Sequence, residues 1–283
     1  MRNGRWRFAV VLFALAACSA EPNVWSIIKT SSPEPASAIG SYANGCLAGA
    51  QSLPPDGPGY QVMRLSRSRF YGHPELIAYL KKLGSQMSRN HGVILIGDMA
   101  QPRGGAMPSG HASHQTGLEA DIWYTHPKSA ETMSLTLKER EELAAPSLVT
   151  TDGSRVDPTR WNTQDATLLR TAARDPNVDR IFVNPAIKRE LCRVAPGSAW
   201  LHKIRPWWGH DEHFHVRLQC PAGDRDCIAQ PANIPAGDGC DATLDWWFTD
   251  EARAAEHQPH NVDISTQPLA ELPDRCKTLA TLP

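Results

Sequence analysis

Two short histidine-rich windows restrict the fold of this chain more than any other feature of its sequence. The windows are SGHASHQTGLEADIWY (residues 109–124) and WWGHDEHFHVRL (residues 207–218). They hold five of the eleven histidines: His111, His114, His210, His213 and His215. A surface run of polar residues is one explanation. The other is that the fold brings the windows together, which requires the two segments to be neighbours in space.

Both windows contain a segment with the alternation of a β-strand, in which every second side chain points to the same face. LEADIWY sends Glu119, Asp121 and Trp123 to one face and apolar side chains to the other. EHFHVRLQC sends His213 and His215 to one face and apolar neighbours into the core. We therefore predict two strands, each with one polar face.

If these strands adjoin, Asp121 meets His215, and His114 joins them across a turn that Gly117 permits. Two imidazoles and one carboxylate, with a position left for water, form a ligand set of catalytic zinc sites. Zinc lowers the pKa of water and polarises a carbonyl, so such a site hydrolyses amides without a side-chain nucleophile. The other histidines are predicted to be ordinary surface or hydrogen-bonded residues: His73, His91, His126, His202, His257 and His260.

The remaining chain mixes helices and strands without a regular βαβ period. Pro74 opens an apolar helical stripe, residues 163–175 are helical, and Pro185 opens another helix. Residues 92–98 and 178–184 are predicted strands. We predict an α+β fold: a small antiparallel sheet carries the zinc site, helices flank it, and the ends are loop-rich and held by disulfides.

The N-terminus, residues 1–20, has the order of a secretory signal peptide: arginines, an apolar run and a small-residue exit. The run is too short to span a bilayer. It ends in LAAC, the pattern of a bacterial lipobox, in which Cys18 would be lipidated. Ser19 would then favour the outer membrane, while cleavage near Ala20 is the alternative. Both alternatives predict export to the periplasm.

Six cysteines remain beyond that segment: Cys46, Cys192, Cys220, Cys227, Cys240 and Cys276. We predict disulfides because the periplasm is oxidising. Zinc ligation by thiolates is the alternative, but none of the six shows a CxxC spacing. Cys220 and Cys227 could close a local loop, and Cys46 and Cys276 could join the two ends. The spacing alone does not choose among the possible pairings.

Composition divides the body of the chain further. We predict an irregular lead-in at residues 21–45, one domain at 46–276 and a tail at 277–283, with mostly loops from residue 221 onward. The formal net charge of -1 and the 21% of charged residues provide no polybasic face for a nucleic acid.

Several motifs give the chain a family resemblance. SHQTGLEAD (113–121) resembles a motif of the zinc peptidases that include D-Ala-D-Ala carboxypeptidases and the lysostaphin type, and HFH supplies an H-x-H. RLSRSRFYGHPELI, MPSGHASHQTGLEADIWY, RIFVNPAIKRELC and PWWGHDEHFHVRLQCP together resemble the penicillin-insensitive murein endopeptidases. The similarity extends from about Cys46 to Cys276.

The resemblance implies roles for individual residues. It places His114, Asp121 and His215 at the ligand positions of one Zn²⁺. His111 is a further ligand or a hydrogen-bond partner of the ligands. The general base or transition-state stabiliser falls on His213. A second catalytic histidine falls on His210.

Disulfides and a further metal site are also implied. The disulfides are Cys46–Cys276, Cys192–Cys240 and Cys220–Cys227. Some relatives form a second site with a D-G-x-H segment, which falls here on TTDGSRVD. Asp152 is present, but Arg155 replaces the histidine and cannot act as a ligand. A second zinc at Asp152 is therefore in doubt.

Together these features predict a zinc-dependent murein DD-endopeptidase that cuts the D-alanyl to meso-diaminopimelyl cross-link of peptidoglycan. Insensitivity to penicillin follows because no serine is acylated. A D,D-carboxypeptidase would share the ligands. A non-catalytic wall-binding protein would have lost a ligand, and here every position is filled.

A serine enzyme of the penicillin-binding class needs three ordered motifs, and only SIIK (26–29) and SRN (88–90) match. The sequence does not indicate an oligomeric state.

A polymeric substrate predicts an open groove rather than a closed pocket. Four aromatic side chains are candidates for its walls: Trp123, Tyr124, Trp207 and Trp208. Ordinary core packing is the alternative for each of them.

Overall fold

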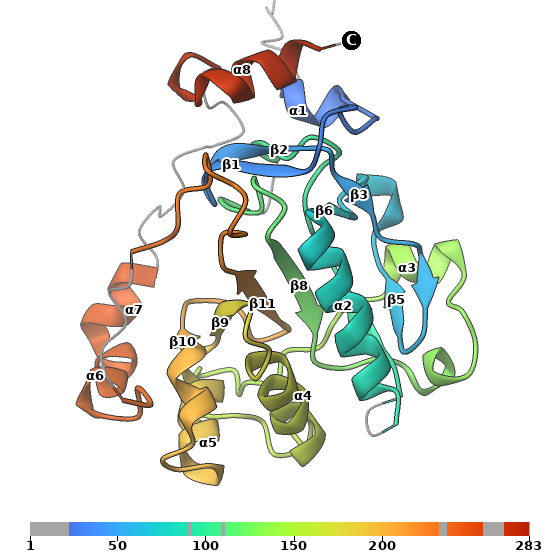
Figure 1. The fold of residues 1–283 in the computed structure, drawn as a ribbon. Helices are drawn as coiled ribbons and strands as arrows, with labels where there is room; N and C mark the ends of the chain where they lie inside the picture. Colours follow the sequence, from blue (N-terminus) through green and yellow to red (C-terminus); the bar gives the residue numbers. More distant parts are fainter. Residues whose placement is uncertain (1–22, 90–91, 109–110, 232–236, 257–268, 283) are drawn as a thin grey trace, which may run out of the picture.

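A seven-stranded sheet runs through the middle of the molecule (Figure 1). The computed structural model describes residues 23–89, 92–108, 111–231, 237–256 and 269–282. The strands lie in the order β10 (Ile204–Pro206), β9 (Val178–Val183), β11 (His213–Leu218), β8 (Glu119–Trp123), β7 (Ile94–Ile96), β5 (Tyr60–Val62) and β4 (Asp56–Gly57). The site-bearing strands β8 and β11 are therefore adjacent and central.

The sheet has seven strands and contains both parallel and antiparallel pairs. The prediction of a small, antiparallel sheet is therefore wrong in the number of strands and in their relative directions. Strand β11 pairs antiparallel with β8 and β9, whereas β9 with β10 and β5 with β7 are parallel. A parallel pair needs a crossover connection, usually a helix. Helix α2 (Pro74–Met87) provides it between β5 and β7, and α5 (Pro185–Val194) provides it between β9 and β10.

Three helices cover one face of this sheet (Figure 1). They are α2, α4 (Thr163–Ala173) and α5, and all three were predicted within a few residues. In α2, the predicted stripe is buried from Leu76 to Leu83. It packs in one core with the apolar sides of β8 and β11, including Ile122 and Phe214. The opposite face of these two strands carries Asp121 on β8 and the two histidines of β11, His213 and His215.

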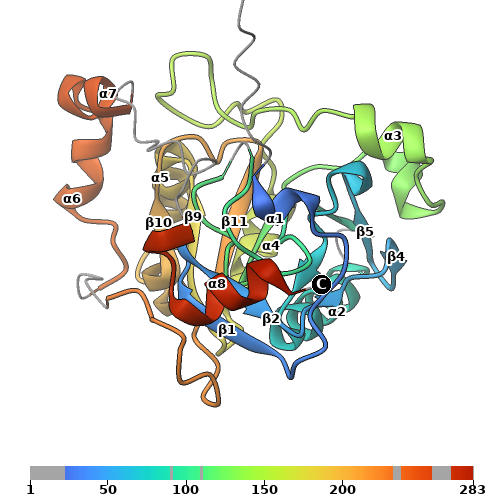
Figure 2. The same cartoon turned by 90° about the horizontal axis from the view of Figure 1, so that it is seen from above.

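Described segments from near the two ends of the chain pack together (Figure 2). Strands β1 (Ser37–Ser41) and β2 (Asn44–Ala48) form a hairpin, so the predicted irregular lead-in is wrong there. Both faces of the hairpin are largely buried, so its sequence lacks the alternation that marks a half-buried strand. Helix α8 (Asp274–Thr281) buries Leu279 in an apolar cluster that also contains Ile39 and Cys46 of the hairpin. Most of the predicted tail at residues 277–283 is therefore part of a helix.

Several shorter elements complete the description. They are α1 (Val24–Ile27), β3 (Gln51–Ser52), β6 (Tyr71–Gly72), α3 (Leu137–Glu142), α6 (Ala242–Asp245) and α7 (Asp250–Glu256). Residues 199–203 and 246–248 form the short 3₁₀ helices η3 and η4. Among the residues described, no helix has both the length and the apolar character that crossing a bilayer requires.

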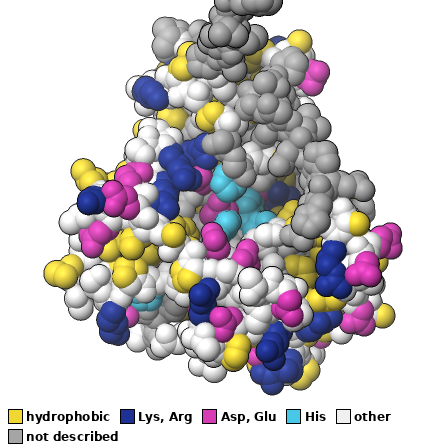
Figure 3. Space-filling model, turned by 180° about the vertical axis from the view of Figure 1, so that it is seen from behind, with side chains coloured by type: hydrophobic (Ala, Val, Ile, Leu, Met, Phe, Trp, Pro, Cys, Tyr) yellow, Lys and Arg dark blue, Asp and Glu magenta, His cyan; other side chains and the backbone are white. Residues whose placement is uncertain are grey.

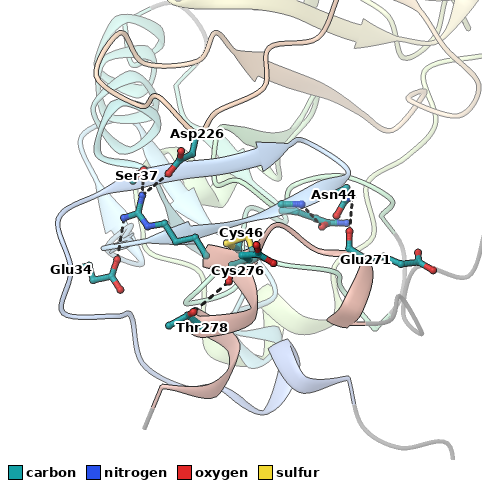
Figure 4. Close-up of a disulfide and its surroundings, with 12 residues drawn as sticks. Glu34, Ser37, Asn44, Cys46, Asp226, Glu271, Cys276 and Thr278 are labelled. Atoms are coloured by element: carbon teal, nitrogen blue, oxygen red, sulfur yellow. Dashed lines mark hydrogen bonds and ion pairs between the residues drawn. A yellow bond between two sulfur atoms is a disulfide. The ribbon is translucent and has the colours of Figure 1, made fainter.

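Three disulfides hold the ends and one side of the molecule. The pairs are Cys46–Cys276, Cys192–Cys240 and Cys220–Cys227, which are the pairs that the family resemblance implies. The first joins β2 to α8 across 230 residues of sequence (Figure 4). Beside it, Arg275 donates hydrogen bonds to Glu34 and Asp226, and so ties α8 to both flanking segments.

Replacing Cys46 and Cys276 together with alanine should lower the free energy of unfolding by about 2–5 kcal/mol, because the disulfide restricts a very long loop in the unfolded chain. The matched control is the Cys220/Cys227 pair, which spans only 7 residues and should contribute less. Urea denaturation of the two double variants measures both losses. Equal losses would contradict the loop-length argument.

Helix α4 carries a buried acid whose titration should affect stability. Burial raises the pKa of Asp165 to about 7, although the backbone N–H of Asn162 donates to it at 2.8 Å and lowers the pKa. A raised pKa favours folding most at low pH, and this contribution is lost as the pH rises from about 4 to about 7. Over that window, wild type should lose stability relative to Asp165→Asn by at most about 1.4 kcal/mol per pH unit. Urea titrations across this pH range measure the difference, and a constant difference would contradict the shift.

Candidate metal centre

Strands β8 and β11 place the two predicted strand ligands directly opposite each other. Asp121 is the register partner of His215, and Trp123 is the partner of His213. His215 Nδ1 lies 3.2 Å from Asp121 Oδ1. The predicted alternation is therefore confirmed, and the condition that the two strands adjoin is met.

A tight loop brings His114 to the same point. Its backbone has φ 68°, in the left-handed region that few non-glycine residues adopt. Gly117 follows with φ 72°, and a Cβ there would lie 2.3 Å from a methyl carbon of Leu47. The side chain of His114 is fully buried, with Nε2 3.4 Å from Asp121 Oδ1. Unusual backbone of this kind often occurs at functional sites.

His111 approaches the other oxygen of the same carboxylate. Its Nε2 lies 3.4 Å from Asp121 Oδ2 and 3.2 Å from Asp98 Oδ2. Arg69 also contacts Asp98 Oδ2, at 2.7 Å. Burial would raise the pKa of Asp98, but the hydrogen bond from His111 and the charge of Arg69 hold it at about 2. Asp98 is thus an anion that orients His111.

Glu119 connects the loop to the strand. Its Oε2 accepts a hydrogen bond from the backbone N–H of His114 at 2.6 Å. Its Oε1 contacts His215 Nε2 at 2.7 Å and Arg217 Nε at 2.6 Å. Burial opposes ionisation, but Arg217 and His215 hold the pKa of Glu119 well below its usual value. This carboxylate fixes the His215 ring with Nδ1 facing Asp121, as carboxylates do behind histidines that bind metals.

The donor set fits a cation. Ligand atoms of His111, His114 and Asp121 all lie within 4.8 Å of one another, and this is the group that the described part of the chain offers to a metal ion. Both ring nitrogens of His114 and Oδ1 of Asp121 are buried without a hydrogen-bond partner among the described residues. Burial would raise the pKa of Asp121, but the surrounding histidines hold it well below its usual value. A buried anion facing unpaired imidazole nitrogens suits a divalent metal.

Two further histidines border the cluster. His213 Nε2 lies 3.8 Å from Asp121 Oδ1, and its side chain is 28% exposed. Burial, and then the neighbouring His215 and His213, lower the pKa of His210 to about 3. His210 Nδ1 lies 2.8 Å from the carbonyl oxygen of Trp208, which can only accept. His210 is therefore neutral, with Nε2 left as an acceptor.

A cleft of about 210 Å³ opens onto this centre. Its lining includes Arg64, Trp123 and Glu212 together with His111, Asp121 and His213. Figure 3 shows histidines at the bottom of a hollow, with acidic and basic side chains around it. Of the predicted groove aromatics, Trp123 lines this cleft, whereas Tyr124 is fully buried in the core.

Asp152 lies apart from the cluster. It is exposed and accepts hydrogen bonds from Thr150 and Ser154 within its own turn. With Arg155 it lines a larger neighbouring cleft. The described residues show one candidate metal site, and Asp152 is not part of it.

Asp98 and Glu119 contact the histidines of the candidate site, and the sequence did not identify them as site residues. Glu119 lies two residues before Asp121 on the same strand face, and Asp98 ends the predicted strand at residues 92–98. These positions were visible in the alternation, but their partners come from distant parts of the chain.

Replacing Glu119 with glutamine should weaken metal binding by about 10–100-fold, because the amide no longer offers a charged acceptor to His215 and His114. It should also lower stability by about 3–5 kcal/mol, since Arg217 loses its counter-charge in a buried position. Competition with a chromophoric chelator measures the affinity. The matched control is the exposed Glu142→Gln, and unchanged affinity in the Glu119 variant would refute the orienting role.

Comparison with known proteins agrees with the geometry. Residues 38–281 match the family model described as penicillin-insensitive murein endopeptidase. A protein of that name from Haemophilus influenzae is 50% identical over 235 residues, which cover 81% of this chain and 80% of the relative. Proteins of the same name from Yersinia enterocolitica and Escherichia coli are each 46% identical over 244 residues. These alignments cover 86% and 85% of this chain, and 84% and 87% of the relatives. The resemblance found in the motifs is confirmed, and the chain belongs to the penicillin-insensitive murein endopeptidase family.

Proposed function

We propose that this murein endopeptidase is zinc-dependent and hydrolyses the amide between D-alanine of one stem peptide and the side-chain amine of meso-diaminopimelate in another. The observation that carries the proposal is the group of His111, His114 and Asp121, with His215 beside it, at an open cleft. Zinc bound there would act as a Lewis acid and lower the pKa of water.

His114, Asp121 and His215 are the proposed protein ligands. A catalytic zinc site uses three protein ligands and keeps one position open, whereas four protein ligands would close it. The side chains of His114 and His215 are 0% and 6% exposed, but that of His111 is 21% exposed. His111 is thus the most exposed of the three histidines, and it would hold the metal or a ligand from the solvent side.

The chain's own residues handle the proton. His213 borders the cleft, where it would accept a proton from the attacking water as general base or stabilise the developing oxyanion. His210 is neutral and offers Nε2 as a second acceptor beside it. Glu119 and Asp98 hold the surrounding imidazoles in place.

A carboxypeptidase that trims stem ends would use the same residues. The open cleft favours a polymeric substrate with chain on both sides of the cut. The test is mass spectrometry of a purified cross-linked muropeptide dimer after incubation with the protein, with and without chelator and penicillin. Conversion to monomers that chelator abolishes and penicillin does not affect supports the proposal. Release of terminal D-alanine alone supports the carboxypeptidase.

Three disulfides and the family suit the oxidising periplasm, and we propose this location for the protein. Anchoring to the outer membrane through a lipid on Cys18 stays a prediction, because Cys18 lies outside the described residues. A Cys18→Ala variant should move the protein from the membrane fraction to the soluble periplasmic fraction. An unchanged distribution would argue for ordinary cleavage near Ala20.

A further inference from the structure

A cluster of tryptophans lies beside the metal centre and has no role in the hydrolysis described above. Trp207 and Trp208 follow β10, and Trp246 and Trp247 belong to η4. Ring centroids are 5.2 Å apart for Trp207 and Trp208, and 4.8 Å apart for Trp208 and Trp247. Trp207 is 45% exposed, and the others are half-buried. Large aromatic side chains gathered at a surface are typical of binding sites.

A cleft of about 830 Å³ runs along this cluster. Trp208 and Trp247 line it, together with Gly209 and Asp211, the two residues that flank His210. Its volume lies within the range of about 300–1,000 Å³ that is usual for ligand sites. The cleft therefore borders the loop that carries His210, beside the smaller cleft that His111 and His213 line.

The remaining lining of this cleft is mostly polar. It includes Thr150, Asp152, Arg155, Asp157 and Arg160. Carboxylates accept hydrogen bonds and guanidinium groups donate them. The cleft can therefore bind a neutral ligand that has many hydrogen-bond donors and acceptors of its own.

The aromatic cluster is held in place by helix α5 at one side of the molecule (Figures 1 and 2). The Cys192–Cys240 disulfide links α5 to the segment just before η4. The buried Lys188 donates hydrogen bonds to the carbonyls of Leu201 and Asp238. Arg189 lies 3.1 Å from the centroid of the Phe248 ring. A surface fixed in this way loses little entropy when a ligand binds.

Two ring distances limit the separation of Trp207 from the metal centre to roughly the length of a short peptide. The Phe182 ring centroid lies 5.6 Å from that of His215 and 6.0 Å from that of Trp207. Three extended residues span roughly 10 Å. Three residues, L-alanine, D-glutamate and diaminopimelate, separate the cross-link from the amino sugar of the glycan strand. A cross-link positioned at the histidines thus leaves that sugar within reach of the tryptophans.

We propose that Trp207, Trp247 and the adjoining cleft bind the N-acetylated amino sugars of the murein strand. The C–H bonds on a pyranose face are weakly positive, and the indole face is negative. Hydroxyl and acetamido groups both donate and accept hydrogen bonds, as the polar lining requires. The stem peptide, by contrast, carries free carboxylates that an uncharged aromatic surface does not attract. This inference rests on the proposed function and adds the glycan to its substrate.

The test compares two cross-linked dimers with the same peptides. One keeps its disaccharides, and the other has had them removed by an amidase. The measured quantity is the ratio of kcat/KM for the two substrates. Wild type should prefer the disaccharide dimer by about tenfold, and Trp247→Ala should reduce the ratio to near one. Trp247→Phe keeps an aromatic face, and Trp200→Ala removes a half-buried tryptophan elsewhere; both should retain the preference.

A binding measurement separates this inference from the proposed hydrolysis. Calorimetry with the uncross-linked disaccharide tetrapeptide reports sugar binding without any cleavage, and Trp207→Ala serves as a second, exposed variant should Trp247→Ala fold poorly. Binding that weakens about tenfold in the tryptophan variants supports the proposal even if neither dimer is cut. The proposal is overturned if wild type has the same kcat/KM on both dimers. It is also overturned if Trp247→Ala lowers kcat/KM equally on both dimers, a result that would assign the surface to the peptide.

Discussion

Replacing Asp121 with alanine should lower the rate of cross-link cleavage by about a thousandfold or more, and the protein should lose its bound zinc. Asp121 is the one carboxylate that all the clustered histidines face, with His111, His114, His213 and His215 within 3.2–3.8 Å of its oxygens. A metal contributes several kcal/mol to the stabilisation of charge in a hydrolytic transition state. Each 1.4 kcal/mol changes the rate about tenfold.

Asp121→Ala also removes a buried negative charge that several histidine side chains surround. The folding of this variant must therefore be checked by thermal melting. Asp121→Asn preserves the shape of the side chain and serves as a second variant. The matched control is Asp274→Asn in α8, which is exposed and far along the chain from the site. Measurements are zinc content and the initial rate on the muropeptide dimer. Turnover within tenfold of wild type, with zinc retained, would contradict the ligand role.

Replacing His213 with alanine should lower kcat by about 100-fold to 10,000-fold, the usual contribution of a general acid or base. His213 lines the cleft, and its ring is more exposed than those of His114 and His215. It is therefore available to the substrate rather than enclosed in the cluster. Because it is not among the proposed ligands, zinc content should stay at the wild-type level.

The combination of lost turnover and retained metal separates this role from that of a ligand. His202→Ala is the control, since that histidine is not among the lining residues of either cleft and its Nδ1 lies 2.8 Å from the carbonyl oxygen of Gly237. Single-turnover kinetics on the dimer and metal analysis of the same preparations provide the two readouts. The assignment would be wrong if the His213 variant kept turnover within threefold of wild type.

The site was predictable where its pattern is local. The alternation in β8 and β11 placed Asp121 and His215 on polar faces, because the period of a strand is a property of consecutive residues. The turn at Gly117 was marked by the glycine itself. The sequence alone did not show that the two strands pair, and the site depended on that pairing. In the structure they do pair, with Asp121 opposite His215.

The errors concern features that depend on distant contacts. Glu119 was assigned to the correct face, but its bonds to Arg217 and to the backbone of His114 exist only after the chain has folded. The parallel pairs of the sheet arise from crossovers through α2 and α5, which periodicity does not reveal. The hairpin of β1 and β2 is buried on both faces, so its sequence resembled an irregular segment.

The most direct test of the account is a zinc titration of the stripped protein. Metal is removed from the disulfide-intact protein with a chelator, and zinc is returned in measured equivalents. Cleavage of the muropeptide dimer by the protein is followed after each addition. The account predicts that activity rises linearly and reaches a plateau at one zinc per chain, since the described residues form one candidate site and Asp152 is not part of it. Activity that is unaffected by stripping, or that requires a second equivalent, would contradict it.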